Sequence, residues 1–146
     1  MSRPRVDHIG VIVTDLGAAI ALFEKLFGGA KPHIKELPDV GLRVAEFEAE
    51  NVTIELLEYT GHNDAFAKQV MGERLGINHV SFGVADLAAS IDAVAAAGAV
   101  RMAGFPRQGA HGKVAFFDPR STGGLLFELC QPDGAAPPSP HNEKTP

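Results

Sequence analysis

The sequence predicts an α+β fold in which two tandem βαβββ modules form a half-open, eight-stranded β cup. One sequence pattern occurs twice, because the segment 6–16 is echoed by the segment 77–87. Each copy also carries one histidine in its opening strand and one glutamate near its end. These four residues are His8, Glu55, His79 and Glu128. Equivalent modules can bring equivalent side chains to one shared point, which favours a single site.

The first module is expected to open with a strand and a helix. β-Branched and apolar residues fill 6–13, which is typical of a strand. Apolar residues recur at helical spacing over 16–27, and Gly28 and Gly29 end that pattern. Asp15 stands where a capping carboxylate would accept hydrogen bonds from the free amides of the helix. Two further strands are expected at 40–48 and 52–59, with a turn at 50–51.

The second module repeats this order. A strand over 77–84 leads to Asp86, the expected N-cap of a helix that starts at Leu87 and ends at Gly98. Further strands are expected at 100–103, 113–118 and 125–130, with a turn at 121–124. The polar linker 61–75 joins the modules and is expected to contain a short helix at 64–71.

One domain is expected to account for nearly the whole chain. A length of 146 residues is enough to bury one substantial core. We expect a single domain over 1–134, made of the modules 6–60 and 76–131. Residues 135–146 hold four prolines and show no apolar periodicity, which predicts a flexible tail.

The amino-acid composition indicates which kinds of binding partner and which cellular compartment to expect. The net charge of −5 argues against a nucleic-acid surface and fits a small-molecule partner. A single cysteine, Cys130, excludes an internal disulfide framework and suits a reducing compartment. There is no apolar run long enough to span a membrane, and no apolar stretch of the signal-peptide type follows the first residues. The expectation is a cytoplasmic protein that binds neither nucleic acid nor membrane.

Alternation of side chains along the strands predicts that the four repeated polar residues lie on the opposite face of the strands from their apolar neighbours. Successive side chains of a strand point to opposite faces, so the apolar neighbours of His8 and of His79 point away from these histidines. Glu55 and Glu128 alternate with apolar residues in the same manner. We therefore expect the helices to cover the apolar faces and the four polar side chains to lie on the uncovered ones.

Two imidazoles and two carboxylates on a shared concave face favour a metal site. A lone histidine or glutamate on a strand is usually structural, but both types recur here at equivalent places. Two carboxylates brought together would repel each other without a cation. The set suits an octahedral divalent ion of Co, Ni, Mn, Zn or Fe with two positions left open. Four protein ligands favour proton transfer through a metal-stabilised enediolate over reaction with O₂.

Several stretches together resemble a known family. They are 7–11, 15–16, 54–58, 76–82 and 109–129, the last containing Ala110-His111-Gly112-Lys113 and 119–124. The sequence is similar over 6–131 to the vicinal oxygen chelate superfamily, and within it most closely to the methylmalonyl-CoA epimerases. The resemblance implies that His8, Glu55, His79 and Glu128 bind the metal. It also implies an acyl-CoA substrate, interconversion of (R)- and (S)-methylmalonyl-CoA, and a homodimer.

Epimerisation needs acid–base groups on both faces of a planar intermediate. Glu128 is one candidate, while the position of the second carboxylate in some family members aligns with Val44. Glu46 is a possible replacement, because a two-residue loop at 50–51 pairs Glu46 with Glu55, and paired residues share a face. The alternative is an exposed glutamate on a strand.

Other assignments stay open. His111 and Lys113 are candidate substrate-binding residues, although a loop histidine and lysine are more often simply solvated. A glyoxalase I-type lyase uses the same ligand types, and a small-molecule binding or resistance protein is the non-enzymatic alternative. The ligand set alone does not identify the metal.

Overall fold

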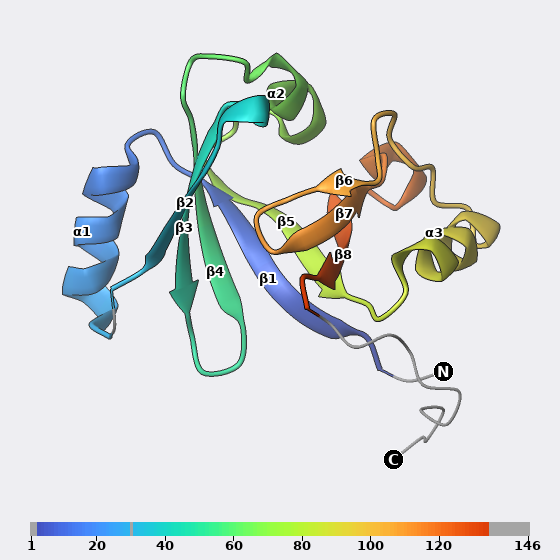
Figure 1. Ribbon diagram of the computed structural model, residues 1–146, viewed down its shortest axis with the longest axis horizontal. Helices are drawn as coiled ribbons and strands as arrows, with labels where there is room; N and C mark the ends of the chain where they lie inside the picture. Colours follow the sequence, from blue (N-terminus) through green and yellow to red (C-terminus); the bar gives the residue numbers. More distant parts are fainter. Residues whose placement is uncertain (1–2, 30, 135–146) are drawn as a thin grey trace. The chain divides into compact units, whose positions relative to one another are not determined.

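The computed structural model describes residues 3–29 and 31–134 and contains the βαβββ order twice (Figure 1). The first copy comprises β1 (Arg5–Ile12), α1 (Leu16–Phe27), β2 (His33–Leu37), β3 (Leu42–Glu48) and β4 (Thr53–Tyr59), with the short 3-10 helix η1 (Pro38–Val40) before β3. Helix α2 (Ala65–Met71) follows. The second copy comprises β5 (Gly76–Gly83), α3 (Leu87–Ala96), β6 (Arg107–Gln108), β7 (Gly112–Phe116) and β8 (Phe127–Pro132), with the 3-10 helix η2 (Pro119–Ser121) before β8. The expected tail at 135–146 lies outside the described residues.

The chain divides into two compact units. The first unit is His8–Val80, and the second unit holds the described residues on either side of it, 3–7 and 81–134. The boundaries therefore fall inside β1 and inside β5. Among the described residues, no helix is both long and apolar enough to cross a membrane.

In the first unit, the strands lie in the order β2-β3-β4-β1, with β1 parallel to β4 and the other pairs antiparallel. Helix α1 packs on one face of these strands (Figure 1). The buried residues of this contact are Leu16, Ala45 and Leu56, and Val11 and Val13 pack against them. His8, Gly10 and Glu55 alternate with these core residues, so they belong to the opposite face. The expected division of faces is confirmed here.

Local sequence explains where α1 begins and ends. The Asp15 carboxylate accepts from the Ala18 amide at 3.0 Å, and the Leu16 amide donates to the Glu58 carboxylate at 2.7 Å. Two of the free amides at the helix start are thereby satisfied. The helix ends before Gly28, whose φ of 66° lies in the region that favours glycine.

The second unit repeats this construction. Strands β8, β7 and β6 are neighbours in that order, and α3 packs against β7 and β8. The Asp86 carboxylate accepts from the Ala89 amide at 3.1 Å, and the Leu87 amide donates to the Gln131 side chain at 2.9 Å. The core of this contact consists of Leu87, Ile91, Ala115, Phe117 and Leu129. The N-terminal contacts of α1 and α3 are therefore equivalent, as the sequence repeat predicts.

Two expectations about strands fail. The predicted strand at 100–103 is wrong in extent, because Arg101 forms only an isolated bridge with Phe117. The edge strand of that module is instead β6, at Arg107–Gln108. Strand β2 was not anticipated, since its five residues are mostly polar and the two on one side, Ile34 and Glu36, are exposed to solvent. The remaining helices and strands lie within about two residues of the expected bounds, which is the usual uncertainty at element ends.

Candidate metal centre

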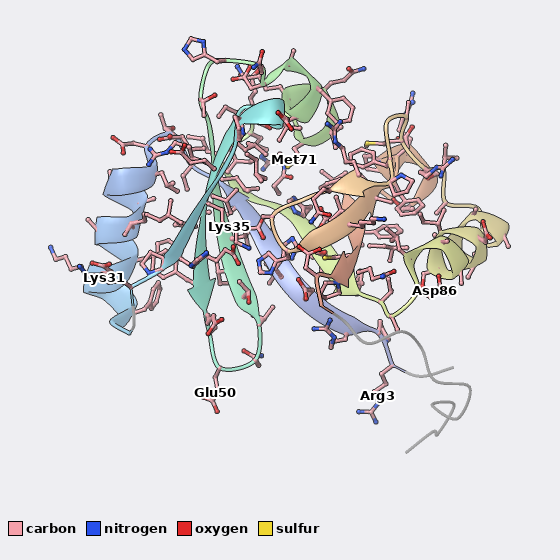
Figure 2. All side chains as sticks on the ribbon, in the orientation of Figure 1. Arg3, Lys31, Lys35, Glu50, Met71 and Asp86 are labelled. Carbon is pink, nitrogen blue, oxygen red and sulfur yellow. The ribbon has the colours of Figure 1, made fainter. Side chains whose placement is uncertain are left out.

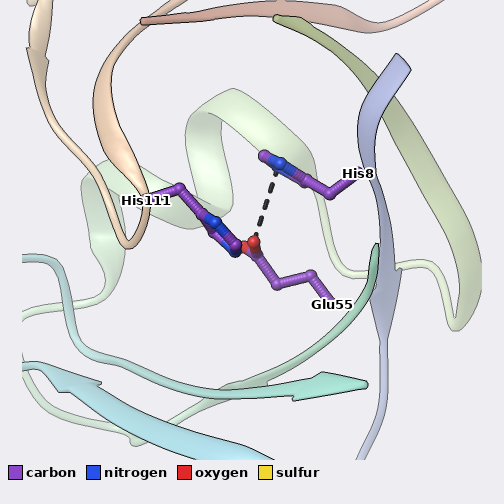
Figure 3. Close-up of side chains that lie close together, drawn as sticks. All are labelled: His8, Glu55 and His111. Carbon is purple, nitrogen blue, oxygen red and sulfur yellow. Dashed lines mark ion pairs between the residues drawn. The ribbon is translucent and has the colours of Figure 1, made fainter. Parts of the chain in front are cut away.

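The first unit brings three of the four predicted ligands together. His8 lies on β1, Glu55 on β4 and His79 on β5, and their exposed fractions are 2%, 5% and 3%. His8 Nε2 lies 3.5 Å from Glu55 Oε2 (Figure 3). The two imidazole rings lie edge to face with centroids 5.8 Å apart. Potential ligand atoms of His8 lie within 4.8 Å of those of both Glu55 and His79.

Gly10 makes room for this cluster. It is the residue on β1 that lies directly beside Glu55 on β4, two positions after His8 on the same face. A Cβ atom added at Gly10 would overlap the imidazole ring of His79. The ring therefore occupies the space that a side chain at position 10 would fill.

These donors fit a divalent transition-metal ion. Imidazole nitrogens and a carboxylate oxygen form a mixed nitrogen and oxygen set that suits Co, Ni, Mn, Zn or Fe. The separation of 3.5 Å between His8 Nε2 and Glu55 Oε2 is longer than a normal hydrogen bond. Two ligands of one ion lie about 3 Å apart for bond lengths of about 2.1 Å.

Glu46 joins the same face from the neighbouring strand. Strands β3 and β4 form the expected hairpin, in which the Ala49 amide donates to the Val52 carbonyl at 2.9 Å and Glu50 stands at the turn (Figure 2). The predicted pairing of Glu46 with Glu55 is confirmed. Glu46 is only 8% exposed, so the alternative of an exposed strand glutamate is wrong.

Lys35 on β2 contacts the Glu46 carboxylate. Its Nζ lies 3.3 Å from Glu46 Oε1, and the lysine side chain is about one-third exposed. A buried carboxylate is costly without a partner, so this ion pair helps to keep Glu46 inside the protein. Lys35 was not predicted as a site residue, because the sequence of β2 does not look like a strand. The sequence signal for this strand was the alternation of residues 33, 35 and 37, which would share one face, with residues 34 and 36.

Asn78 is a second residue of the site that was not predicted from the sequence. Its side-chain oxygen lies 2.8 Å from His79 Nδ1, and its amide nitrogen donates to the Met71 carbonyl at 2.7 Å. The sequence shows that Asn78 precedes His79, but this does not reveal that the two side chains are in contact.

The other three predicted residues belong to the second unit. Glu128 on β8 is 5% exposed and lies opposite Phe116 of β7, on the face that α3 does not cover. His111 precedes β7, is half-buried, and accepts a hydrogen bond from the Asp133 amide through its carbonyl. Lys113 is exposed and, by strand alternation, lies on the other face of β7 from Phe116.

The sequence matches a known family over most of its length. Residues 7–117 match the glyoxalase/bleomycin resistance protein/dioxygenase superfamily. The chain belongs to this superfamily. The family that the repeated motifs resemble is therefore confirmed, and the α+β fold with paired βαβββ modules is the fold of this superfamily.

Relatives within the superfamily include epimerases. The chain is 36% identical over 133 residues to an ethylmalonyl-CoA/methylmalonyl-CoA epimerase of Cereibacter sphaeroides, covering 87% of this chain and 97% of that protein. It is 34% identical over 140 residues to the uncharacterized protein YqjC of Bacillus subtilis, covering 95% and 97%. A solved structure of a methylmalonyl-CoA epimerase in complex with methylmalonyl-CoA and NH4+ is similar with a TM-score of 0.75 and 27% identity, covering 94% of this chain and all of that one.

Proposed function

We propose that this protein is a metal-dependent epimerase that interconverts (R)- and (S)-methylmalonyl-CoA, or a related acyl-CoA, by 1,1-proton transfer. The observation that carries the proposal is the buried Glu46, paired in register with Glu55 beside the His8 and His79 imidazoles. A buried carboxylate next to this cluster supports the proposal, because such a group can accept and return a proton. The similarity to epimerases, one of them bound to methylmalonyl-CoA, supports the substrate class.

His8, Glu55 and His79 would hold the metal, and we propose Glu128 as the fourth ligand. Glu128 occupies the place in the second module that Glu55 occupies in the first, and it is also a buried carboxylate on a face that no helix covers. A bound divalent ion would stabilise the negative charge that develops on the substrate oxygens when the α-carbon loses its proton.

Proton transfer on both faces of the α-carbon requires two groups. We assign these roles to Glu46 and Glu128. The strand register brings Glu46 beside Glu55, and Glu46 is not one of the four proposed ligands. The Lys35 ammonium holds the Glu46 carboxylate in place. Val44, two residues earlier on the same face, is fully buried and apolar, so it supplies no proton acceptor.

His111 is proposed to contact the substrate, because it is a half-buried imidazole at the start of β7. Lys113 is a weaker candidate, since strand alternation directs it to the opposite face from Gly112 and Val114. The homodimer implied by the family resemblance also stays a proposal.

Solvent-deuterium exchange tests this function directly. Metal-loaded protein is incubated in D₂O with (R)-methylmalonyl-CoA, and α-deuteration and formation of the (S) epimer are followed by NMR against metal-free protein and buffer alone. We expect both signals only with the metal-loaded protein. Turnover of the methylglyoxal–glutathione hemithioacetal without exchange of the acyl-CoA would replace the epimerase with a glyoxalase I-type lyase. Binding of either compound without exchange or turnover would favour a binding protein.

A further inference from the structure

Asn78 connects the C-terminal end of α2 to the His79 ring. Its amide nitrogen lies 2.7 Å from the carbonyl oxygen of Met71, the last residue of α2. Its side-chain oxygen lies 2.8 Å from His79 Nδ1. All three residues belong to the first unit, and His79 is almost completely buried.

The contact with α2 fixes which way the Asn78 amide points. The last carbonyls of a helix have no partner within the helix and take hydrogen bonds from elsewhere. A carbonyl oxygen only accepts, so the atom of Asn78 that faces Met71 must be the NH₂ group. The amide oxygen is thereby directed to His79, and a flipped amide would place two oxygens in contact.

The orientation of the amide in turn fixes the proton on His79. An amide oxygen only accepts, so the hydrogen bond of 2.8 Å requires a hydrogen on His79 Nδ1. In the neutral ring the other nitrogen, Nε2, then carries the lone pair. A lone pair on Nε2 is what a metal ligand needs, and a hydrogen bond on the far ring nitrogen is a common support for metal-bound histidines.

We infer that Asn78 is a positioning residue that holds His79 as its Nδ1–H tautomer, with Nε2 presented to the metal ion. The inference rests on the metal site of the proposed function. It adds that the position of α2 contributes to the site, because the end of this helix orients Asn78.

Strand β4 anchors the same end of α2. The Tyr59 hydroxyl donates to the carbonyl of Gly72, the residue directly after α2, and the Lys68 ammonium lies 5.5 Å from the centre of the Tyr59 ring. Tyr59 and the ligand Glu55 both lie on β4, four residues apart. One strand therefore carries a metal ligand and also holds the helix end that sets the His79 tautomer.

The test compares three substitutions at Asn78 with a control amide. Asn78→Ala and Asn78→Leu remove both hydrogen bonds, and the leucine keeps most of the side-chain volume. Asn78→Asp restores an acceptor for His79 Nδ1 but not the donor to Met71. Gln108→Ala is the control, because the Gln108 amide is exposed and contacts Asp133 of the second unit.

Two measurements are made on each full-length variant. The ¹⁵N chemical shifts of the His79 ring in metal-free protein report the tautomer, and titration with Co²⁺ alone, followed by optical absorption, reports affinity. We expect the alanine and leucine variants to lose the Nδ1–H preference and to bind Co²⁺ about 10- to 100-fold more weakly. The aspartate variant should keep the tautomer, and the control should match the wild type in both measurements.

The inference is overturned if a folded alanine or leucine variant keeps the wild-type ring shifts and binds Co²⁺ within about twofold of the wild type. It is also overturned if His79→Ala leaves Co²⁺ affinity unchanged, since His79 is then no ligand. A wild-type protein that binds Co²⁺ through His79 but does not epimerise methylmalonyl-CoA contradicts the proposed function, while weaker Co²⁺ binding by its alanine and leucine variants still supports the role of Asn78. The two failures can thus be told apart.

Discussion

Glu46 and Glu55 lie directly opposite each other on β3 and β4, and each carboxylate has a different basic neighbour. Glu55 lies 3.5 Å from the His8 imidazole, and Glu46 lies 3.3 Å from the Lys35 ammonium. Two buried carboxylates this close in the sheet would be unfavourable if they shared one partner. The separate neighbours suggest separate roles, with Glu55 as a ligand and Glu46 as an acid–base group.

Replacing Glu46 by glutamine should abolish most activity and leave the metal in place. An amide of nearly the same shape cannot accept and return the α-proton, so we expect the epimerisation rate to fall by about 10²- to 10⁴-fold. Metal content, measured by elemental analysis, should not change. Glu48→Gln is a matched control, because Glu48 lies two residues later on the same strand and is exposed. An unchanged rate for Glu46→Gln with intact metal would remove Glu46 from the mechanism.

A methyl group at Gly10 should disrupt the metal centre. The Cβ of Gly10→Ala would overlap the His79 ring, which would have to move away from His8. We expect a loss of Co²⁺ affinity of at least about tenfold, the lower limit for a disturbed ligand shell. Gly17→Ala is the control, because its Cβ would meet only Asp15 Oδ1 at 3.5 Å. Because alanine restricts the unfolded chain more than glycine does, that change at the start of α1 should stabilise the protein by about 0.4–1 kcal/mol. Equal Co²⁺ affinity of the two variants would contradict this account of Gly10.

Metal removal should lower the stability of the protein. An ion that binds only the folded chain adds about 2.7 kcal/mol when its free concentration is 100 times Kd. Thermal unfolding with and without Co²⁺, after chelation and dialysis, measures the difference. His8→Ala should lose most of this metal-dependent increment, whereas His33→Ala, which alters an exposed histidine on β2, should keep it. An increment that survives in His8→Ala would place the ion elsewhere.

Tyr59 should make stability fall in alkaline solution. Burial, followed by the negative charges of Glu73 and Asp64, raises the pKa of Tyr59 from 10.0 to about 12. The unfolded chain therefore loses this proton first, so the contribution of Tyr59 is complete below pH 10 and is lost as the pH rises toward 12. Because the ring is only partly buried, solvent screening should keep the loss at pH 11 near or below about 1 kcal/mol.

The raised pKa of Tyr59 can be measured directly by absorbance. Tyr59 is its only tyrosine and tryptophan is absent, so tyrosinate absorbance follows Tyr59 alone. Unfolding of Tyr59→Phe should lack the part of the alkaline decline that the wild type shows between pH 10 and 12. An ordinary tyrosinate titration in the folded wild type would contradict the stated environment.

Much of the site could be predicted because it depends on local rules. The length of the β3–β4 turn sets the register, and the register alone gives the pairing of Glu46 with Glu55. Asp15 and Asp86 mark the helix starts through a side-chain acceptor that is visible in the sequence. Alternation along β1 predicts the face on which His8 lies.

The parts that escaped prediction depend on contacts between distant segments. Lys35 meets Glu46 only through the pairing of β2 with β3, and β2 lacks the β-branched run that marks a strand. The link from Asn78 to Met71 requires α2 to end beside β5, which no local pattern specifies. Near 100–103, apolar residues suggest a strand, but Gly104 and Pro106 follow and the ladder stops at a single bridge.

The two imidazoles are close in space but come from opposite ends of the sequence of the first unit. His8 is its first residue, and His79 is next to its last. One ion bound by both residues would crosslink the two ends of this unit and close the chain between them into a loop. A covalent crosslink closing a loop of such length removes unfolded-state entropy worth roughly 4 kcal/mol in the chain-entropy model. Occupancy of the site should therefore slow local opening of β1 and β5 together, so that their amides gain protection from hydrogen exchange in step.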